Sequence, residues 1–328
     1  MTVPVPASIP AVIPGDGVDV IGDIHGHIDP LVRLLRELGY EPVDGVWRHP
    51  SRTAAFIGDL VDRGPGQIEV LELVRAMVEA GSARIVLGNH EFNAVAFATE
   101  WPDRPGEFVR RRYDPNRRQH AVFLEAVGVD SPVHDHWIEW FHTIPMWDEV
   151  RLGEATLRLI HACWSDRDLD VVRPLLGPER TLTEEFVLAA SRRGSPVYES
   201  LEVLIKGPEA HMGGATYRDK EGHVRDKARL QWWLADARTL REAVLIPGNA
   251  TGMTGEVPDI PIDNEHLYTS DIPVIVGHYW AEPGTVPWSD KVACVDHSIA
   301  KGGHLAAYRW SGEQSLVASN IVSVPAHP

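Results

Sequence analysis

The sequence is poor in cysteine and has no long apolar run. Two of its 328 residues are cysteines, Cys163 and Cys294, and two separated thiols supply neither a disulfide framework nor a zinc ribbon. Such sparing use of cysteine is typical of proteins in a reducing cytoplasm, which is where we expect this chain to act. No stretch approaches the roughly 18 to 20 apolar residues of a membrane-spanning helix, so we expect no membrane partner.

Basic residues are also scarce. The chain has 31 Lys and Arg residues against 47 Asp and Glu, which gives a formal net charge of −16. A field of this sign repels a nucleic-acid duplex and an anionic membrane surface, so we expect neither as a stable partner. A phosphate-binding site must therefore be positive locally. Nothing in the sequence indicates an oligomeric state.

One segment runs against this acidic balance. Residues 101–119 contain six arginines, at positions 104, 110, 111, 112, 117 and 118. The segment is either a solvated connector or a positive lip that attracts a phosphorylated substrate.

The chain has no linker rich in Gly, Ser or Pro that would separate two domains. Residues 1–15 contain four prolines and no basic residue, so they lack the pattern of a signal peptide and are expected to be a flexible lead-in. We expect a single domain over residues 16–315 with an inserted cap at about 165–270, followed by a tail at 316–328. Asp44-Gly45, in the segment 40–53, predicts a small hairpin.

The first 100 residues repeat a plan of strand, polar loop and helix. The β-branched run 18–21 is followed by Gly22-Asp23-Ile24-His25-Gly26, and then by a helix with apolar residues at helical spacing. Asp23 and His25 are two residues apart in a tight turn, so both can point at one centre. Mixed oxygen and nitrogen ligands suit manganese, iron or zinc.

The second polar loop contains three candidate functional side chains. The apolar run 54–57 leads into Gly58-Asp59-Leu60-Val61-Asp62-Arg63-Gly64. Asp59 follows the strand directly and can bridge two cations with its two oxygens. Asp62 and Arg63 come one turn later, where a carboxylate can orient a base and a guanidinium can clamp a phosphate.

The third loop is Gly88-Asn89-His90-Glu91, after the strand 84–87 and before a helix expected from Phe92 to Thr99. Three such units place their loops along one rim at the carboxyl ends of the strands, which is where open α/β sheets keep their sites.

Two later histidines, His161 and His278, also follow short apolar strands. A single histidine there is usually structural, but the shared position indicates a common centre. Asp23, His25 and Asp59 then hold one metal ion, and Asp59, Asn89, His161 and His278 hold a second. Two such ions activate a bridging water for an in-line phosphoryl displacement. We expect two divalent ions, Mn²⁺ first, with iron or zinc as alternatives.

These ordered motifs resemble the phosphoprotein phosphatase branch of the calcineurin-like metallophosphoesterases. The resemblance covers residues 18 to 91 and resumes at 157 to 164 and 274 to 310. The segment from Asp296 to Gly303 is similar to bacterial diadenosine tetraphosphatases and Rhizobiales-like phosphatases, which indicates the bacterial-type branch. The resemblance implies an α/β fold with a central sandwich of two mixed sheets flanked by helices, and a dimetal site in the loops at one edge.

The resemblance also implies roles for single residues. Asp59 would bridge the metals, His90 would protonate the leaving oxygen, and Asp62 would orient His90. Arg63 would bind the phosphate, and Asn89 would also contact the substrate.

The sequence departs from the family in two places. Ala162-Cys163 replaces two glycines that often follow the motif histidine, and we expect this thiol to be open to oxidation. The usual second phosphate-binding arginine has no clear counterpart, and Lys206 and Arg225 are the candidates.

The sequence leaves three functions open. The first is a metal-dependent phosphatase acting on phosphorylated Ser, Thr or Tyr side chains of proteins. The second is hydrolysis of a dinucleoside tetraphosphate or another small nucleotide, for which four aromatic residues could stack on bases, namely Trp232, Trp233, Tyr279 and Trp280. The third, a non-catalytic binding module on the same fold, is opposed by the presence of every expected ligand type and of His90.

Overall fold

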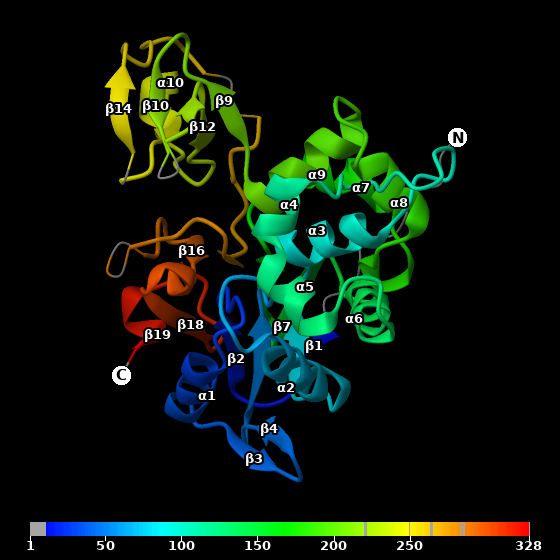
Figure 1. Ribbon diagram of the computed structural model, residues 1–328. Coiled ribbons are helices and arrows are strands. Elements are labelled where there is room, and N and C mark those ends of the chain that lie inside the picture. The colour runs from blue at the N-terminus through cyan, green and yellow to red at the C-terminus, as the bar shows by residue number, and fades with distance from the viewer. Residues whose placement is uncertain are drawn as a thin grey trace, which may run out of the picture.

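Two mixed β-sheets face each other at the centre of the molecule (Figure 1). The computed structural model describes residues 11–219, 222–248, 250–262, 265–282, 284 and 286–327. The first sheet has the order β17-β18-β2-β5-β6, with β19 also paired to β18. Its strands are β2 (Gly17–Ile21), β5 (Arg52–Phe56), β6 (Ala83–Ile85), β17 (Asp296–His297), β18 (His304–Trp310) and β19 (Ile321–Pro325).

The second sheet has the order β1-β7-β8-β15-β16. Its strands are β1 (Ala11–Val12), β7 (Trp147–Leu152), β8 (Ala155–Ile160), β15 (Val274–Val276) and β16 (Val292–Cys294). Both sheets combine parallel and antiparallel pairs. The expected sandwich of two mixed sheets is confirmed.

The period-two alternation of the strands separates two cores. Val18 and Val20 of β2 pack between the sheets with Leu157 and Trp310, whereas Ile21 packs on the opposite face of its sheet, among the helices. Successive side chains of a strand point to opposite faces, so one short strand supplies both cores.

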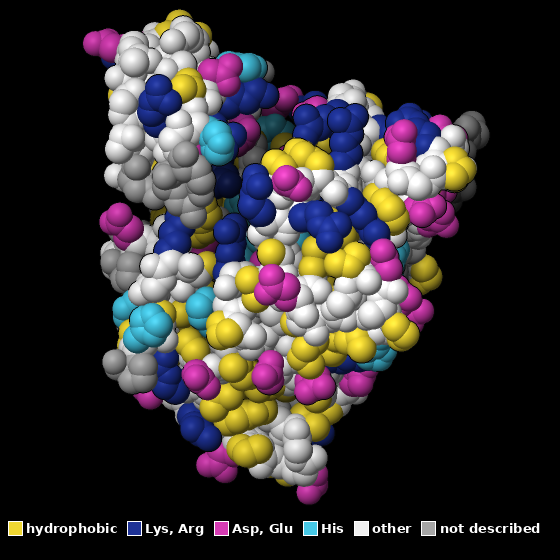
Figure 2. Space-filling view, in the orientation of Figure 1, with side chains coloured by type: hydrophobic (Ala, Val, Ile, Leu, Met, Phe, Trp, Pro, Cys, Tyr) yellow, Lys and Arg dark blue, Asp and Glu magenta, His cyan; other side chains and the backbone are white. Residues whose placement is uncertain are grey.

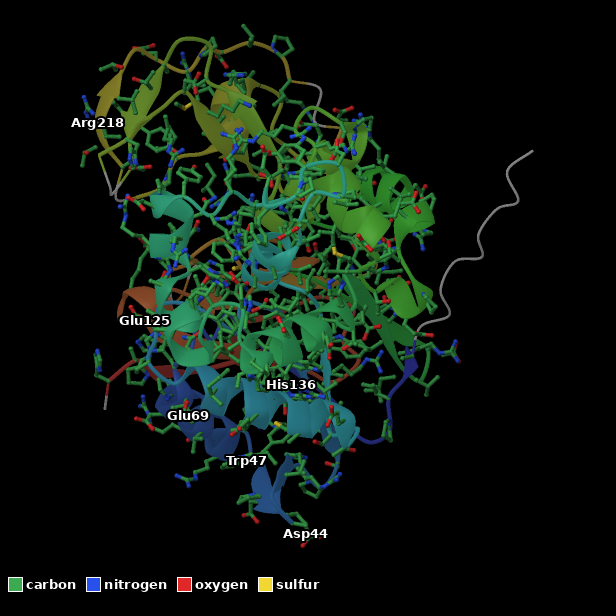
Figure 3. All side chains as sticks on the ribbon, turned by 45° about the vertical axis from the view of Figure 1, so that its right-hand side comes forward. Asp44, Trp47, Glu69, Glu125, His136 and Arg218 are labelled. Atoms are coloured by element: carbon green, nitrogen blue, oxygen red, sulfur yellow. The ribbon has the colours of Figure 1, made fainter. Side chains whose placement is uncertain are left out.

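Two helices cover the outer face of the first sheet. They are α1 (Ile28–Glu37) and α2 (Gln67–Glu79). Leu31, Leu34 and Leu35 of α1 are fully buried, in keeping with their helical spacing. The hairpin predicted around Asp44-Gly45 is also present, as β3 (Glu41–Val43) and β4 (Val46–Arg48). It projects from the lower end of the molecule, where Figure 3 labels Asp44 and Trp47.

The next seven helices along the chain lie above and to the right of the two sheets in Figure 1. They are α3 (Asn89–Ala98), α4 (Asp114–Gln119), α5 (Ala121–Val127), α6 (Pro132–His142), α7 (Asp166–Val172), α8 (Glu184–Ala190) and α9 (Pro196–Lys206). The expectation that the third helix begins at Phe92 is wrong. Helix α3 already begins at Asn89, because Gly88 is its N-cap and the Glu91 side chain caps its first turn.

The segment 165–270 forms two different structures. Helices α7 to α9 pack into the main core, whereas residues 209–262 form a separate lobe, yellow-green in Figure 1. The lobe contains β9 (Glu209–His211), β10 (Thr216–Arg218), β11 (Val224–Arg225), β12 (Lys227–Leu230), α10 (Leu240–Ala243), β13 (Val244–Leu245) and β14 (Thr251–Thr254). It has its own small core, which includes Met212, Ala215 and Leu230.

The ends of the chain take part in the sheets. Residues 1–10 of the expected lead-in lie outside the described residues, but Ala11 and Val12 pair with Val150 and Arg151 of β7. In the expected tail, β19 pairs with β18 over five residues. Across the described ranges, no helix has the length and apolar character needed to cross a membrane.

A buried ion pair ties the first sheet together. Asp19 of β2 is fully buried, and its Oδ1 lies 2.9 Å from Nε of Arg52 and 3.1 Å from Nε of Arg309. These arginines stand on the two strands that flank β2. One carboxylate therefore neutralises cations from both neighbours.

We predict that Asp19→Asn lowers the free energy of unfolding by about 3 kcal/mol, since it leaves the buried guanidinium of Arg52 without a counter-charge. Urea unfolding measures this change. The matched control is Glu79→Gln, which breaks the exposed pair with Arg75 and is expected to cost less than about 0.5 kcal/mol. Equal losses in the two variants would contradict the prediction.

Candidate metal centre

Five loops from both sheets converge at one edge of the sandwich. The strands β2, β5 and β6 are parallel neighbours, so the three motif loops that follow them emerge side by side. In the second sheet β8 and β15 are also parallel neighbours, and they end just before His161 and His278. The rim expected from the sequence is therefore present, with contributions from both sheets.

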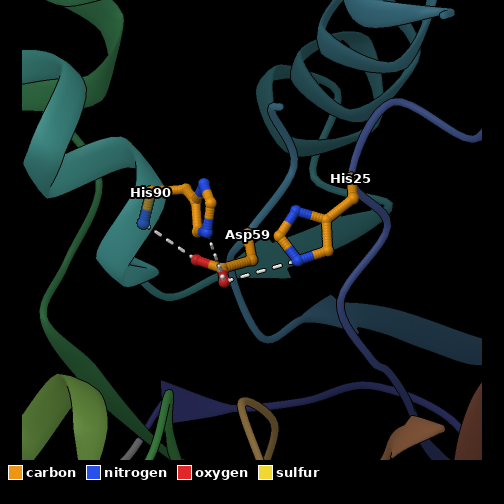
Figure 4. A group of neighbouring side chains, drawn as sticks. All are labelled: His25, Asp59 and His90. Atoms are coloured by element: carbon orange, nitrogen blue, oxygen red, sulfur yellow. Dashed lines mark hydrogen bonds and ion pairs between the residues drawn. The ribbon is translucent and has the colours of Figure 1, made fainter. Parts of the chain in front are cut away.

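Asp59 lies at the centre of these loops. Its carboxylate oxygens are 3.7 Å from Nε2 of His25, 3.8 Å from Nε2 of His90 and 3.4 Å from Nε2 of His161. Figure 4 shows His25 and His90 on opposite sides of this carboxylate. The expectation that Asp59 is shared between two groups of ligands fits this arrangement.

Two groups of possible donors share Asp59. One group is His25, Asp59 and His90, and the other is Asp59, His161 and His278, with the donor atoms of each group within 4.8 Å of one another. The first group differs from the predicted set, because it contains His90, the expected proton donor, and not Asp23. Asn89 joins the second group, because its Oδ1 is 3.1 Å from Nε2 of His161. Asp23 lines one pocket together with His25, Asn89 and His278, which we call the metal-ligand pocket, and it accepts the backbone N–H of His278 at 3.2 Å.

Backbone carbonyls orient two of the histidines as metal ligands. Nδ1 of His25 lies 2.9 Å from the carbonyl oxygen of Val61, and Nδ1 of His161 lies 2.8 Å from that of Ile57. Donation of Nδ1–H to a carbonyl leaves Nε2 unprotonated and directed at Asp59, which is the tautomer that binds a metal ion. Burial lowers the pKa of His25 to about 4, so this imidazole is neutral near pH 7.

The buried charges indicate a need for cations. Burial raises the pKa of Asp23 well above its usual value, and the carboxylates of Asp296 and Asp59 raise it further. Divalent cations would remove this repulsion. Oxygen and imidazole nitrogen donors in one buried cluster suit Mn²⁺, iron or zinc, so the residues present fit a pair of divalent ions.

The loops hold their ligands in unusual backbone conformations. His25, Asp59 and His278 have φ values of 48°, 52° and 70°, in the left-handed region that non-glycine residues rarely occupy. Gly58 permits the close approach of two loops, since a Cβ there would lie 2.3 Å from the backbone nitrogen of Gly88. Such strain at a functional site persists because surrounding contacts enforce it.

Glu91 supplies one of those contacts, and the sequence analysis gave it no role. Its buried carboxylate accepts the backbone N–H groups of Asp59 and Leu60, both at 2.8 Å, and of Gly88 at 3.1 Å. One side chain thus fixes the Asp59 loop against the start of α3. Glu91 is the last residue of the third motif, and this position is the feature of the sequence from which its role could have been predicted.

Asp62 contacts the ring of His90, the residue that it was predicted to orient. Oδ2 of Asp62 lies 2.5 Å from Nδ1 of His90, while Oδ1 lies 2.7 Å from Nδ1 of His120. Burial acts to raise the pKa of Asp62, but His120 and His90 together hold it well below its usual value. His120 therefore holds Asp62 in place through the carboxylate oxygen opposite to the one that contacts His90. It belongs to no motif and directly follows the arginine-rich segment, so the sequence pattern did not indicate this contact.

A second arginine reaches the site from the lobe. Nη2 of Arg229, on β12, lies 2.8 Å from Nε2 of His278. Burial and this guanidinium hold the pKa of His278 well below its usual value, so the imidazole is neutral. Arg63 lies exposed at the mouth of the same pocket. Two guanidinium groups are therefore available beside the ligands.

Neither of the two candidates offered for that second cation lines this pocket. Arg225 is on the lobe, where its guanidinium pairs with Asp219 at 2.7 Å. The suggestion that Arg225 is the second phosphate-binding cation is therefore wrong. Lys206, at the end of α9, pairs with Glu202 at 2.5 Å and lines a neighbouring groove. Its role in substrate binding stays a prediction.

Most of the aromatic side chains considered for base stacking belong to the core. Trp232, Trp233 and Tyr279 are buried. The ring of Trp233 stacks on Trp288 with centroids 3.8 Å apart. Trp280 alone of the four is exposed at the pocket, with 36% of its surface accessible. The stacking hypothesis is therefore wrong for the three buried rings.

Cys163 is fully buried, and burial raises the pKa of its thiol well above the usual value. The backbone N–H groups of Ala162 and Cys163 both point at the carbonyl of Leu204. A buried, protonated thiol is inert, so the expectation of an oxidisable thiol is wrong.

Comparison with known proteins agrees with this geometry. The sequence model of a family described as calcineurin-like phosphoesterase matches residues 18–185. A symmetrical bis(5'-nucleosyl)-tetraphosphatase of Methylobacillus flagellatus is 28% identical over 94% of this chain and 95% of its own length. An asymmetrical bis(5'-nucleosyl)-tetraphosphatase of Halalkalibacterium halodurans is 51% identical over 73 residues, but the match spans 22% of this chain and 30% of that protein.

A solved structure shows how widely the fold is shared. A serine/threonine phosphatase of Saccharomyces cerevisiae superposes with a TM-score of 0.50 at 14% identity, covering 97% of this chain and 82% of the other. At that identity the likeness concerns the fold alone.

We predict that Asp59→Asn weakens binding of both metal ions at once, by roughly 10- to 100-fold or more, because loss of a mere outer-shell partner already costs that much. Calorimetric titration with Mn²⁺ resolves the two sites. His25→Ala is the matched control, since His25 belongs to one donor group and should weaken one site more than the other. A single affected site in Asp59→Asn would remove Asp59 as the shared ligand.

Proposed function

This chain belongs to the calcineurin-like phosphoesterase family, and from that premise we propose that it hydrolyses dinucleoside tetraphosphates into two nucleoside diphosphates. The family makes the chain a phosphoester hydrolase. The observation that carries the choice of substrate is the match to the symmetrical tetraphosphatase, which extends over 94% of this chain and so includes the lobe that delivers Arg229.

Six residues are proposed to hold the two metal ions, namely Asp23, His25, Asp59, Asn89, His161 and His278. When bound, divalent ions, for which Mn²⁺ is our first choice, lower the pKa of water and neutralise charge on phosphoryl oxygens. Arg63 and Arg229 are proposed to bind the outer phosphoryl oxygens, because guanidinium groups match that geometry.

His90 is proposed as the proton donor. Burial favours the neutral imidazole, but the carboxylates of Asp59 and Asp62 raise the pKa of His90 to about 9, so the ring carries a proton to give near pH 7. Asp62 accepts from Nδ1 and leaves Nε2 facing the pocket. As water attacks the phosphorus, the bond to the leaving oxygen breaks and that oxygen takes the proton of His90.

The phosphoprotein substrate, which the sequence analysis placed first, has weaker support. Its structural relative shares the fold at 14% identity, and no described feature favours a protein over a nucleotide. Phosphopeptides are therefore included among the substrates of the test, and a preference for one of them is a possible result.

The test is turnover of three substrates by the Mn²⁺-loaded protein: diadenosine tetraphosphate, a phosphoserine peptide and a phosphotyrosine peptide. We expect the highest kcat/KM for the dinucleotide, with ADP as the sole product. Preference for either peptide would overturn the substrate assignment, and ATP with AMP as products would overturn the symmetrical cleavage.

We predict that His90→Ala slows hydrolysis of the phosphoserine peptide by about 10²- to 10⁴-fold, the usual range for a lost general acid. Cleavage of the dinucleotide should fall less, because its leaving phosphate group has a pKa of about 6 and needs less help from an acid. Turnover of both substrates measures this difference, and His136→Ala, an exposed histidine of α6 (Figure 3), is the control. Equal losses would refute the role of His90 as acid, and loss of bound metal would place His90 among the ligands.

A further inference from the structure

A second, larger cavity lies beside the metal-ligand pocket and shares no lining residue with it. Its lining comes from α3, from the connector between α3 and α4, and from the segment that runs from the end of α8 through α9. Its volume is about 1160 Å³, which is larger than the usual range of about 300 to 1,000 Å³ for small-molecule sites. We call it the basic groove.

The groove is strongly positive in an acidic protein. Seven basic and two acidic side chains line it, and both acids are engaged, Glu107 with Arg104 and Glu202 with Lys206. Three of the other arginines, Arg111, Arg192 and Arg193, make no ion pair among the described residues. Figure 2 shows Lys and Arg side chains gathered over the region where Figure 1 draws α3, α4 and α9.

Helix α3 connects the groove to the metal-ligand pocket. Asn89 and His90 begin the helix at the pocket, while Asn93 and Ala96 line the groove. At a rise of 1.5 Å per residue, these positions lie about 6 and 10 Å along the axis from Asn89. The groove therefore begins about one helical turn from the metal-ligand pocket, on the same helix.

The chemistry of the groove fits a nucleotide. Tyr113 is 53% exposed, and half-buried Tyr198 lies within the electrostatic influence of Arg193. Guanidinium groups bind phosphates in bidentate fashion, and a flat exposed ring can stack on a base. A nucleotide uses both features at once, because it offers phosphates to the guanidinium groups and a flat base to the rings.

Building on the proposed function, we propose that the basic groove binds the leaving nucleoside diphosphate half of the substrate. Arg111, Arg192 and Arg193 contact its phosphates, and Tyr113 or Tyr198 stacks on its base. The groove thereby separates dinucleotides from small phosphate esters, which occupy the metal-ligand pocket alone.

The test compares two substrates of the full-length protein, diadenosine tetraphosphate and p-nitrophenyl phosphate. The variant is Arg111→Ala combined with Arg193→Ala, two exposed side chains that form no ion pair with any residue that the structure describes. We expect the ratio of kcat/KM for the dinucleotide to that for the aryl phosphate to fall about tenfold or more, through KM, because charge-assisted hydrogen bonds are lost. Arg48→Ala, in the hairpin at the far end of the molecule (Figures 1 and 3), is the control. An unchanged ratio would overturn the proposal.

A binding measurement separates this proposal from the proposed function. We expect calorimetry in EDTA to show that ADP binds the wild-type protein, and that the double variant binds it about tenfold more weakly. ADP binding that depends on these arginines, in a protein that does not cleave the dinucleotide, would support the groove and sink the proposed function. If the dinucleotide is cleaved but ADP binds both proteins equally, the groove proposal alone is overturned. If an acidic phosphopeptide displaces ADP at a concentration below that of ADP, a nucleotide is overturned as the occupant of the groove.

Discussion

The carboxylate of Glu91 is the contact on which the site depends. It accepts backbone N–H groups from Asp59 and Leu60 and from Gly88, the N-cap of α3, so one side chain links two loops from neighbouring strands. The backbone N–H of His90 in turn donates to Asp59 at 2.9 Å. The left-handed conformation of Asp59 is maintained because this network leaves its loop no alternative partner.

A cluster of buried acids and histidines is a costly arrangement unless cations enter it. Burial, and after it repulsion from Asp296 and Asp59, raises the pKa of Asp23, while neighbouring histidines hold the pKa of Asp59 low despite its burial. The fold tolerates the cluster because the sandwich around it is rigid and apolar. Metal affinity and the proton on His90 therefore arise from the same desolvated charges, and the function is built from an arrangement that does not favour stability.

The residues that we propose for substrate recognition lie outside the loops that carry most of the metal ligands. The two sheets carry the ligands, the lobe at 209–262 delivers Arg229 to His278, and the connector between α3 and α4 lines the basic groove. Surface loops and lobes can change without disturbing a core of paired strands. The fold itself is shared with a yeast protein phosphatase of 14% identity.

The sequence by itself predicted the rim and the types of ligand, because each depends on local order: a strand of four or five residues, a glycine-flanked loop and a helix of period 3.6. The sandwich of two sheets was predicted through the family resemblance that these motifs carry. The tertiary structure decided the rest. Arg229 meets His278 across 49 residues and His120 meets Asp62 across 58, and no local period encodes such contacts. The burial of Trp233 and Cys163, which the sequence left open to other roles, was likewise fixed only when distant segments packed together.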